Sequence, residues 1–156
     1  MGTDRQRDER LDRLQAFIGR WRLEAPAFPI PAELAEAARA SFEWTLDEMF
    51  LLEWSVIPGP VAPDGLCVVG LDGEDGYTQH YFDSRGIARV YSMSFDGREW
   101  TLERNAPDFT PLNFHQRWSG TFSSDGNTIE GRWESSPDGR QWKLDFELFY
   151  RRVARA

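Results

Sequence analysis

Cysteine and histidine are scarce in this sequence, and their scarcity excludes several kinds of site. Cys67 is the single cysteine, so no intrachain disulfide can form, which is typical of a reducing compartment. His80 and His115 are the only histidines, whereas a zinc site usually takes three or four protein ligands at recognisable spacing. No such spacing is present, and we therefore expect no metal site.

A surplus of positive charge and long apolar segments are also missing. The formal net charge is -8, which argues against nucleic acid and anionic membranes as partners, because both attract clustered Lys and Arg. The N-terminus, MGTDRQRDERLDRL, is too charged for a signal peptide, and no apolar run approaches the ~20 residues that a membrane helix needs. We therefore expect a cytoplasmic protein whose partner is a small hydrophobic or aromatic molecule, and a homodimer stays open.

Aromatic residues and turn formers are abundant instead. The chain has 7 Trp, 11 Phe and 4 Tyr, and 13 Gly and 9 Pro interrupt it often, a pattern typical of aromatic strands separated by tight turns. Residues 120–153 are predicted to form three antiparallel strands, because Asp125-Gly126 and Asp138-Gly139 are strong hairpin signals. The last of these strands is predicted to bury the side chains at alternate positions: Trp142, Leu144, Phe146, Leu148 and Tyr150.

The spacing of the turns predicts the fold. From residue 40 onward turn signals recur roughly every 8–12 residues, which indicates about ten strands with short links and antiparallel pairing. Closing these strands into a barrel removes the exposed edges of an open sheet. We therefore predict an all-β, antiparallel, roughly ten-stranded β-barrel as a single domain over residues 17–153. Residues 1–16 form a charged tail and a short N-terminal helix that plugs one end, and the barrel has room for a small ligand.

Polar residues on otherwise apolar strand faces make up the candidate ligand site. If those faces point inward, the site contains His80, Arg89, Tyr91, Arg104 and Gln116, flanked by Trp100 and Trp118. Burying two guanidinium groups with no anion costs several kcal/mol, so either a carboxylate-bearing ligand or an internal acid must accompany Arg89 and Arg104. The alternative is that both arginines lie at strand ends and reach water.

Two sets of motifs carry a family resemblance. Gly19-x-Trp21 in the predicted first strand, together with Arg151-Arg152 on the last strand, resembles the calycin signature of lipocalins and fatty-acid-binding proteins. This resemblance implies that the arginine packs across the tryptophan and closes one end of the barrel. Residues 69–153, with pieces such as GREWTLER and SSDGNTIEGRWESSPDGRQWKLDFELFYRR, are similar to a lipocalin-like bacterial family of unknown function that resembles nitrobindin, a ten-stranded haem barrel, in fold. The resemblance implies a calycin-like fold and a cavity.

Catalytic motifs are missing from the chain. Gly-x-Ser-x-Gly is absent and no carboxylate pair stands out, so we predict no catalytic residue. The nitrobindin resemblance implies a proximal haem ligand near the C-terminus, but residues 145–153 contain no histidine, and no cofactor is expected. The sequence therefore favours a carrier or sensor that holds an apolar or aromatic ligand, with or without an anionic group, inside the barrel. Two alternatives stay open: a haem-dependent or His80-dependent enzyme of nitrobindin type, and a structural or interaction protein with a filled barrel.

Overall fold

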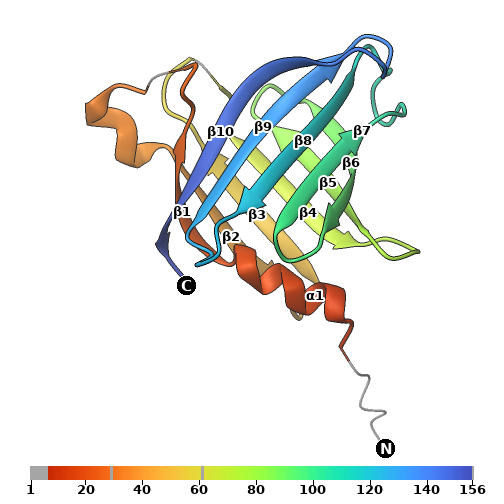
Figure 1. Cartoon of the computed structure of the whole chain (residues 1–156), viewed down its shortest axis with the longest axis horizontal. Coiled ribbons are helices and arrows are strands. Elements are labelled where there is room, and N and C mark those ends of the chain that lie inside the picture. The colour runs from red at the N-terminus through yellow and green to blue at the C-terminus, as the bar shows by residue number, and fades with distance from the viewer. Residues whose placement is uncertain (1–6, 29, 61, 156) are drawn as a thin grey trace, which may run out of the picture.

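The computed structural model describes residues 7–28, 30–60 and 62–155, and its fold is a closed β-barrel (Figure 1). Within these residues ten antiparallel strands follow one another around the barrel, and β1 pairs with β10 to close it. The strands are β1 (Gly19–Glu24), β2 (Arg39–Thr45), β3 (Phe50–Val56), β4 (Gly65–Leu71), β5 (Tyr77–Asp83), β6 (Ala88–Phe95), β7 (Glu99–Arg104), β8 (His115–Phe122), β9 (Thr128–Ser136) and β10 (Lys143–Ala154). The helical segments are α1 (Glu9–Arg13) and the 3-10 turns η1 (Leu14–Phe17) and η2 (Ala32–Ala37). The predicted barrel with a short N-terminal helix is confirmed.

The hairpins that join β8, β9 and β10 turn at the predicted Asp-Gly pairs. Gly126 and Gly139 have φ values of 74° and 76°, in the left-handed region that glycine adopts without strain. The Asp125 carboxylate accepts a hydrogen bond from the backbone N–H of Asn127 at 2.9 Å, and Asp138 makes the same kind of turn. The side chain and the glycine together fix each turn, so strand register follows from local sequence.

The N-terminal helical turns lie across one end of the barrel, which we call the closed end (Figure 1). Leu11, Leu14 and Phe17 are buried there, as part of the hydrophobic core. The centroid of the Phe17 ring lies 4.8–5.2 Å from the centroids of four other rings, those of Phe42, Phe95, Trp100 and Phe122. This aromatic cluster fills the closed end with side chains.

Arg152 and Trp21 lie together at the closed end, where β1 pairs with β10. The guanidinium carbon of Arg152 is 4.1 Å from the centroid of the Trp21 ring, and its nitrogens donate to two backbone oxygens of the N-terminal segment at 2.6 and 2.7 Å. Gly19 has a φ of 130°, and a Cβ at this position would be 2.2 Å from the Ala154 carbonyl oxygen. Arg151 points outward instead and pairs with a carboxylate of β1 at 3.1 Å. Arg152 is therefore the arginine of the pair that packs on Trp21, while Arg151 joins β10 to β1 on the outer face.

The buried face of β10 is shorter than predicted. Leu144 is 55% exposed, and Trp142 packs against the Arg117 guanidinium at 4.1 Å rather than in the core. A register shift between Leu144 and Phe146 interrupts the alternation of the strand, so that only the residues from Phe146 onward keep the inward phase. The prediction that Leu144 and Trp142 share the buried face is wrong for this reason.

Candidate functional site

The solvent exposure of the inward side chains differs between the two ends of the barrel. The open end is the one where the loops after β1, β3, β5, β7 and β9 lie (Figure 1). At the closed end Phe17 and Trp21 are 0% exposed. In the open half Glu53, Cys67 and Gln116 point inward and yet remain 6%, 8% and 9% exposed. Because these side chains face the interior, their residual exposure means that a water-sized sphere fits beside them. A water-sized sphere therefore reaches these three side chains, whereas it does not reach Phe17 or Trp21.

Buried polar side chains gather in this open half. We call them the polar layer: Glu53, Cys67, Gln79, Tyr91, Arg104, Gln116 and Tyr150. They belong to seven strands and share the inward phase of each strand with core residues. The Tyr150 hydroxyl donates to Glu53 Oε2 at 3.2 Å, although β10 and β3 are not neighbours in the sheet. The polar side chains therefore meet across the interior of the barrel.

Glu53 supplies the carboxylate that lies deepest in the polar layer, and it is not among the predicted site residues. Burial raises the pKa of Glu53 to about 7, and the hydrogen bonds from the Tyr150 hydroxyl and the Cys67 thiol offset this only in part. Acid and carboxylate forms therefore coexist near neutral pH. The sequence contained a signal for this residue, because Glu53 is the single charged residue in β3 and shares its phase with Leu51.

Arg104 is paired with an acid of the same chain. Its Nε donates to Asp108 Oδ2 at 2.8 Å and its Nη2 to Asp108 Oδ1 at 2.9 Å, and both side chains are almost fully buried. The backbone N–H of Val90 also donates to Asp108, at 2.9 Å. The hydrogen bonds from Arg104 hold the pKa of Asp108 well below its usual range. Of the two predicted alternatives for Arg104, the internal acid is the one that the structure contains.

Arg89, Tyr91 and Gln116 form one hydrogen-bonded group near the open end. The Tyr91 hydroxyl donates to Gln116 Oε1 at 2.9 Å, and Arg89 Nη1 donates to the same oxygen at 3.2 Å. Arg89 is half-buried, and its guanidinium carbon lies 5.6 Å from the centroid of the Phe114 ring. These three predicted site residues are brought together by the structure, with Arg89 at the rim.

Gln79 belongs to the polar layer but is not among the predicted site residues. The prediction places its neighbour His80 on the inward face of β5 instead. Its side chain is 3% exposed and makes no hydrogen bond to any side chain or backbone group in the described part of the chain. In the register of β5, Gln79 stands opposite Val69 of β4 and Tyr91 of β6, both of which are buried. An inward amide without a partner is a group able to bind a ligand.

His80 points away from the interior, and its prediction as a site residue is wrong. It stands opposite Val68 and Val90, which lie in the outward phase of β4 and β6. Thr78, His80 and Phe82 alternate with Tyr77, Gln79 and Tyr81, so both faces of β5 contain aromatic and polar residues. Periodicity alone cannot decide which face of such a strand is buried.

Trp100 and Trp118 are both core residues, and their ring centroids lie 5.2 Å apart. The Trp100 ring packs edge-on against Phe17 at 4.9 Å and so belongs to the closed end. The Trp118 ring lies over Gly131, where a Cβ would be 2.3 Å from it, and its centroid is 5.5 Å from that of Trp133. Neither indole N–H has a hydrogen-bond partner within the residues that the structure describes. Trp118 is therefore enclosed between Trp100 and Trp133, and its indole N–H is not accessible from the open half.

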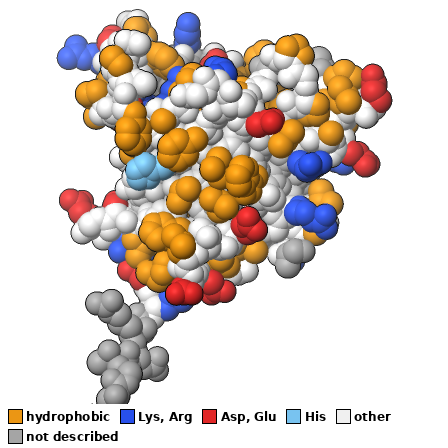
Figure 2. Space-filling model, turned by 180° about the vertical axis from the view of Figure 1, so that it is seen from behind, with side chains coloured by type: hydrophobic (Ala, Val, Ile, Leu, Met, Phe, Trp, Pro, Cys, Tyr) orange, Lys and Arg blue, Asp and Glu red, His pale blue; other side chains and the backbone are white. Residues whose placement is uncertain are grey.

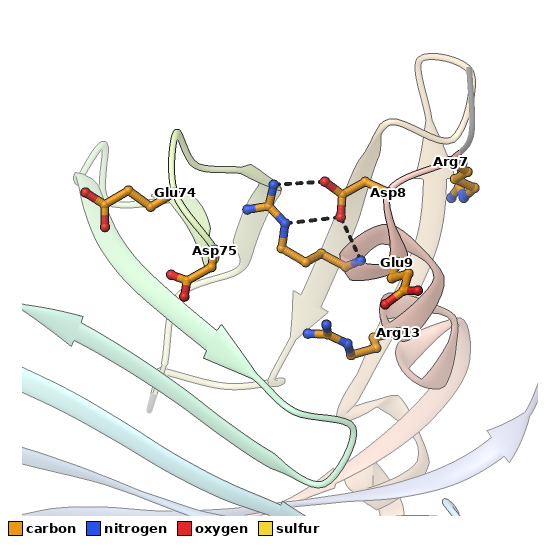
Figure 3. Close-up of a pocket in the computed structure, with 7 residues that line it drawn as sticks. Arg7, Asp8, Glu9, Arg13, Glu74 and Asp75 are labelled. Atoms are coloured by element: carbon orange, nitrogen blue, oxygen red, sulfur yellow. Dashed lines mark hydrogen bonds and ion pairs between the residues drawn. The ribbon is translucent and has the colours of Figure 1, made fainter. Parts of the chain in front are cut away.

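Two hollows lie outside the barrel interior. One, of about 480 Å³, lies beside α1 and the turn after β4 (Figure 3). Arg10 crosses it, donating to Asp8 at 2.9 Å and to the Gly76 carbonyl oxygen at 2.9 Å. The second, of about 450 Å³, lies between η2 and residues 22–26. Neither hollow is lined by a residue of the polar layer. In the first, the hydrogen bond from Arg10 to Gly76 holds α1 against the barrel.

A haem bound through histidine does not fit the interior. His80 faces outward, and His115 at the rim of β8 lies with its Nδ1 3.1 Å from Asn105 Oδ1. The described ranges contain no group of three or more His, Cys, Asp and Glu side chains arranged to hold a metal ion. Neither histidine is therefore positioned to ligate a haem inside the barrel, and His80 does not face a ligand held there.

Comparison of the sequence with protein-family models and with curated proteins finds no match. The closed ten-stranded antiparallel barrel is consistent with a calycin-like or lipocalin-like fold. Across residues 7–28, 30–60 and 62–155, no helix has both the length and the apolar character needed to cross a membrane.

Proposed function

We propose that the protein binds a small apolar or aromatic molecule in the open half of the barrel and acts as a carrier or sensor. The observation that supports this most directly is the contrast in exposure between the two ends of the interior, with 0% for Phe17 and 6–9% for Glu53, Cys67 and Gln116. Small-molecule sites combine apolar walls with a few placed polar groups, and the open half has both.

Aromatic side chains form the apolar walls of this half. Tyr81, Trp133 and Phe146 are half-buried and lie in or beside the core, and the Trp133 centroid is 5.7 Å from that of Tyr91. Rings at the entrance of a barrel offer flat surfaces against which another ring can stack. An aromatic ligand fits such walls better than a flexible aliphatic one.

The charges near the interior limit what a ligand can carry. Arg104 is neutralised by Asp108 at 2.8 Å and needs no anion from a ligand. Arg89, at the rim, donates only to the neutral Gln116 amide and to no carboxylate among the described residues. An anionic group on a ligand would therefore meet Arg89 at the entrance, and the interior itself favours an uncharged molecule.

The motif resemblance supports the same proposal. A relation to the lipocalin-like, nitrobindin-like bacterial family would account for Gly19, Trp21 and Arg152 meeting at the closed end. Barrels of that kind hold their ligand inside, which agrees with a site at the polar layer.

The proposal is tested by titration with N-phenyl-1-naphthylamine, an uncharged aromatic fluorophore that accepts excitation energy from tryptophan. We expect saturable binding of one molecule per chain. Ser55 lies in the inward phase of β3 near the open end, whereas Ser92 is exposed on the outer face of β6. Ser55→Trp should abolish binding by filling the entrance, and Ser92→Trp is the matched control that should bind as the wild type does. Absence of saturable binding to the wild type would leave the filled barrel as the better account.

A further inference from the structure

We infer that the open half recognises an uncharged aromatic ring system that carries an amide-like edge, meaning a hydrogen-bond donor next to an acceptor. Gln79 binds this edge, and Glu53 lies on the same wall, two strands away. The inference rests on the proposed function and names the class of ligand. Lactams fused to an aromatic ring carry such an edge.

Gln79, Cys67 and Glu53 lie on one wall of the interior. Glu53 stands directly opposite Cys67 in the pairing of β3 with β4, and Gln79 stands opposite Val69, two residues along the same inner face of β4. Glu53 and Gln79 are therefore separated by β4, a distance of two strand spacings or about 10 Å. A bicyclic ligand that hydrogen-bonds Gln79 reaches across β4 toward Glu53.

These groups have unused hydrogen-bonding capacity. A primary amide has two donor hydrogens and an acceptor oxygen, and Gln79 uses none of them within the described residues. Glu53 accepts from the Tyr150 hydroxyl through Oε2 and from the Cys67 thiol, and because a carboxylate has about four acceptor sites, capacity for a ligand remains. With a pKa of about 7, the Glu53 side chain also presents an O–H donor in part of the molecules at neutral pH. The amide atoms of Gln79 keep accessible surface, unlike the enclosed indole N–H groups of Trp100 and Trp118, so a lactam edge can reach them and make two hydrogen bonds.

A second wall, formed by Tyr91 and Trp133, suits the ring of the ligand. Tyr91 stands next to Gln79 in the pairing of β5 with β6, and its ring centroid is 5.7 Å from that of Trp133. Cationic ligands are disfavoured at the entrance, because Arg89 approaches the interior from the rim of β6 and donates to no carboxylate among the described residues. A planar, uncharged heterocycle matches both walls.

Competition experiments with three compounds of similar size test the inference. 2-Quinolinone has the lactam edge, N-methyl-2-quinolinone lacks the N–H donor, and naphthalene lacks both groups. We expect 2-quinolinone to displace N-phenyl-1-naphthylamine from the wild type at a concentration at least tenfold lower than either of the other two. Gln79→Met keeps the length of the side chain and should remove this advantage, whereas Thr78→Met, on the outward phase of the same strand, should keep it.

The possible results separate the two proposals. If N-phenyl-1-naphthylamine binds but the three compounds compete equally, the inference fails and the proposed function stands. If no probe binds in a saturable way, the proposed function fails. The comparison of 2-quinolinone with its N-methyl derivative needs no variant, so a folding defect of Gln79→Met leaves the test intact.

A separate observation concerns the outer wall formed by β3, β4 and β5. Its outward positions are uncharged, and cross-strand pairing joins them into two rows, Trp54–Leu66–Phe82 and Leu52–Val68–His80. Trp54 is 49% exposed and Phe82 is 39% exposed. Figure 2 shows hydrophobic side chains gathered on the face of the molecule turned away from the viewer in Figure 1. The outward positions of β8 and β9 differ, since they include Arg117, Glu130, Arg132 and Glu134.

We propose that a second copy of this chain covers the uncharged wall. Each chain has a net charge of -8, so two copies repel one another wherever their acidic surfaces meet. Two copies that meet through the wall of Trp54, Leu66 and Phe82 bring no like charges of these outward positions together. A whole aromatic side chain has about 150–250 Å² of surface, so Trp54 at 49% exposure and Phe82 at 39% together present roughly 150–200 Å², which Leu66 and Val68 on the strand between them extend.

Sedimentation velocity of the full chain tests the dimer. We expect a dimer at concentrations of tens of micromolar, and a monomer for Trp54→Lys and, independently, for Phe82→Lys. Thr101→Lys, on the outward phase of β7, is the matched control and should remain a dimer. A wild-type monomer, or a dimer that neither lysine weakens, would overturn the proposal.

Discussion

Replacing Glu53 by glutamine should change how stability depends on pH. The pKa of Glu53 rises from its ordinary value of 4.5 to about 7 because the side chain is buried. A tenfold change in proton affinity is worth about 1.4 kcal/mol, so ionised Glu53 destabilises the folded wild type by about 3 kcal/mol. Below pH 4.5 the folded and unfolded chains are both protonated at this site and the penalty is absent. As pH rises the unfolded chain loses its proton first, so stability falls until pH exceeds about 7.

Glu53→Gln has no proton to lose, and the difference between the two proteins isolates this effect. Other carboxylates with lowered pKa values, such as Asp83 at about 2, are ionised in both proteins throughout the range. Urea unfolding followed by tryptophan fluorescence gives the free energy of unfolding at each pH. Between pH 5 and pH 8 the variant should gain about 2–3 kcal/mol relative to the wild type. A difference that stays constant within about 0.5 kcal/mol across this range would refute a buried, ionisable Glu53.

Three further substitutions test how the barrel is held together, each by urea unfolding. Trp21→Ala should cost about 3–5 kcal/mol, because the ring is fully buried and Arg152 stacks on it; a cost below 1 kcal/mol would contradict closure by this pair. Asp108→Ala should cost about 3–5 kcal/mol because it leaves the Arg104 guanidinium buried and unpaired, and a neutral effect would mean that Arg104 reaches water. Gly131→Ala should cost about 1–3 kcal/mol, since the added methyl would lie 2.3 Å from the Trp118 ring; an unchanged stability would show that the ring moves freely.

The fold follows from local signals that the sequence carries in repeated form. Asp-Gly turns fix hairpins within a few residues, and period-2 alternation marks the strands between them, so barrel closure follows from strand number and short links. Leu144 was misplaced because a register shift on β10 depends on its pairing with β9 rather than on its own alternation. A domain boundary at residue 17 and a cytoplasmic location stay predictions.

The candidate site was less predictable, for reasons of phase and of long-range pairing. On β5 both phases contain aromatic and polar residues, so His80 was preferred to Gln79 although only Gln79 faces the interior. The acid that pairs with Arg104 comes from the loop after β7, where no periodicity identifies it. Glu53 and Tyr150 are 97 residues apart in sequence, and only the closed barrel brings them to 3.2 Å.

The most direct test of the account is whether a ligand enters the barrel or adheres to its outer wall. Tryptophan indole N–H resonances in a 15N-labelled sample distinguish these sites, because Trp133 is half-buried on the inward phase of β9 and Trp54 lies on the exposed outer wall. On titration with N-phenyl-1-naphthylamine we expect the Trp133 resonance to shift in a saturable way at one molecule per chain, while that of Trp54 stays in place. A shift confined to Trp54, with Trp133 unaffected at saturation, would contradict a ligand site inside the barrel.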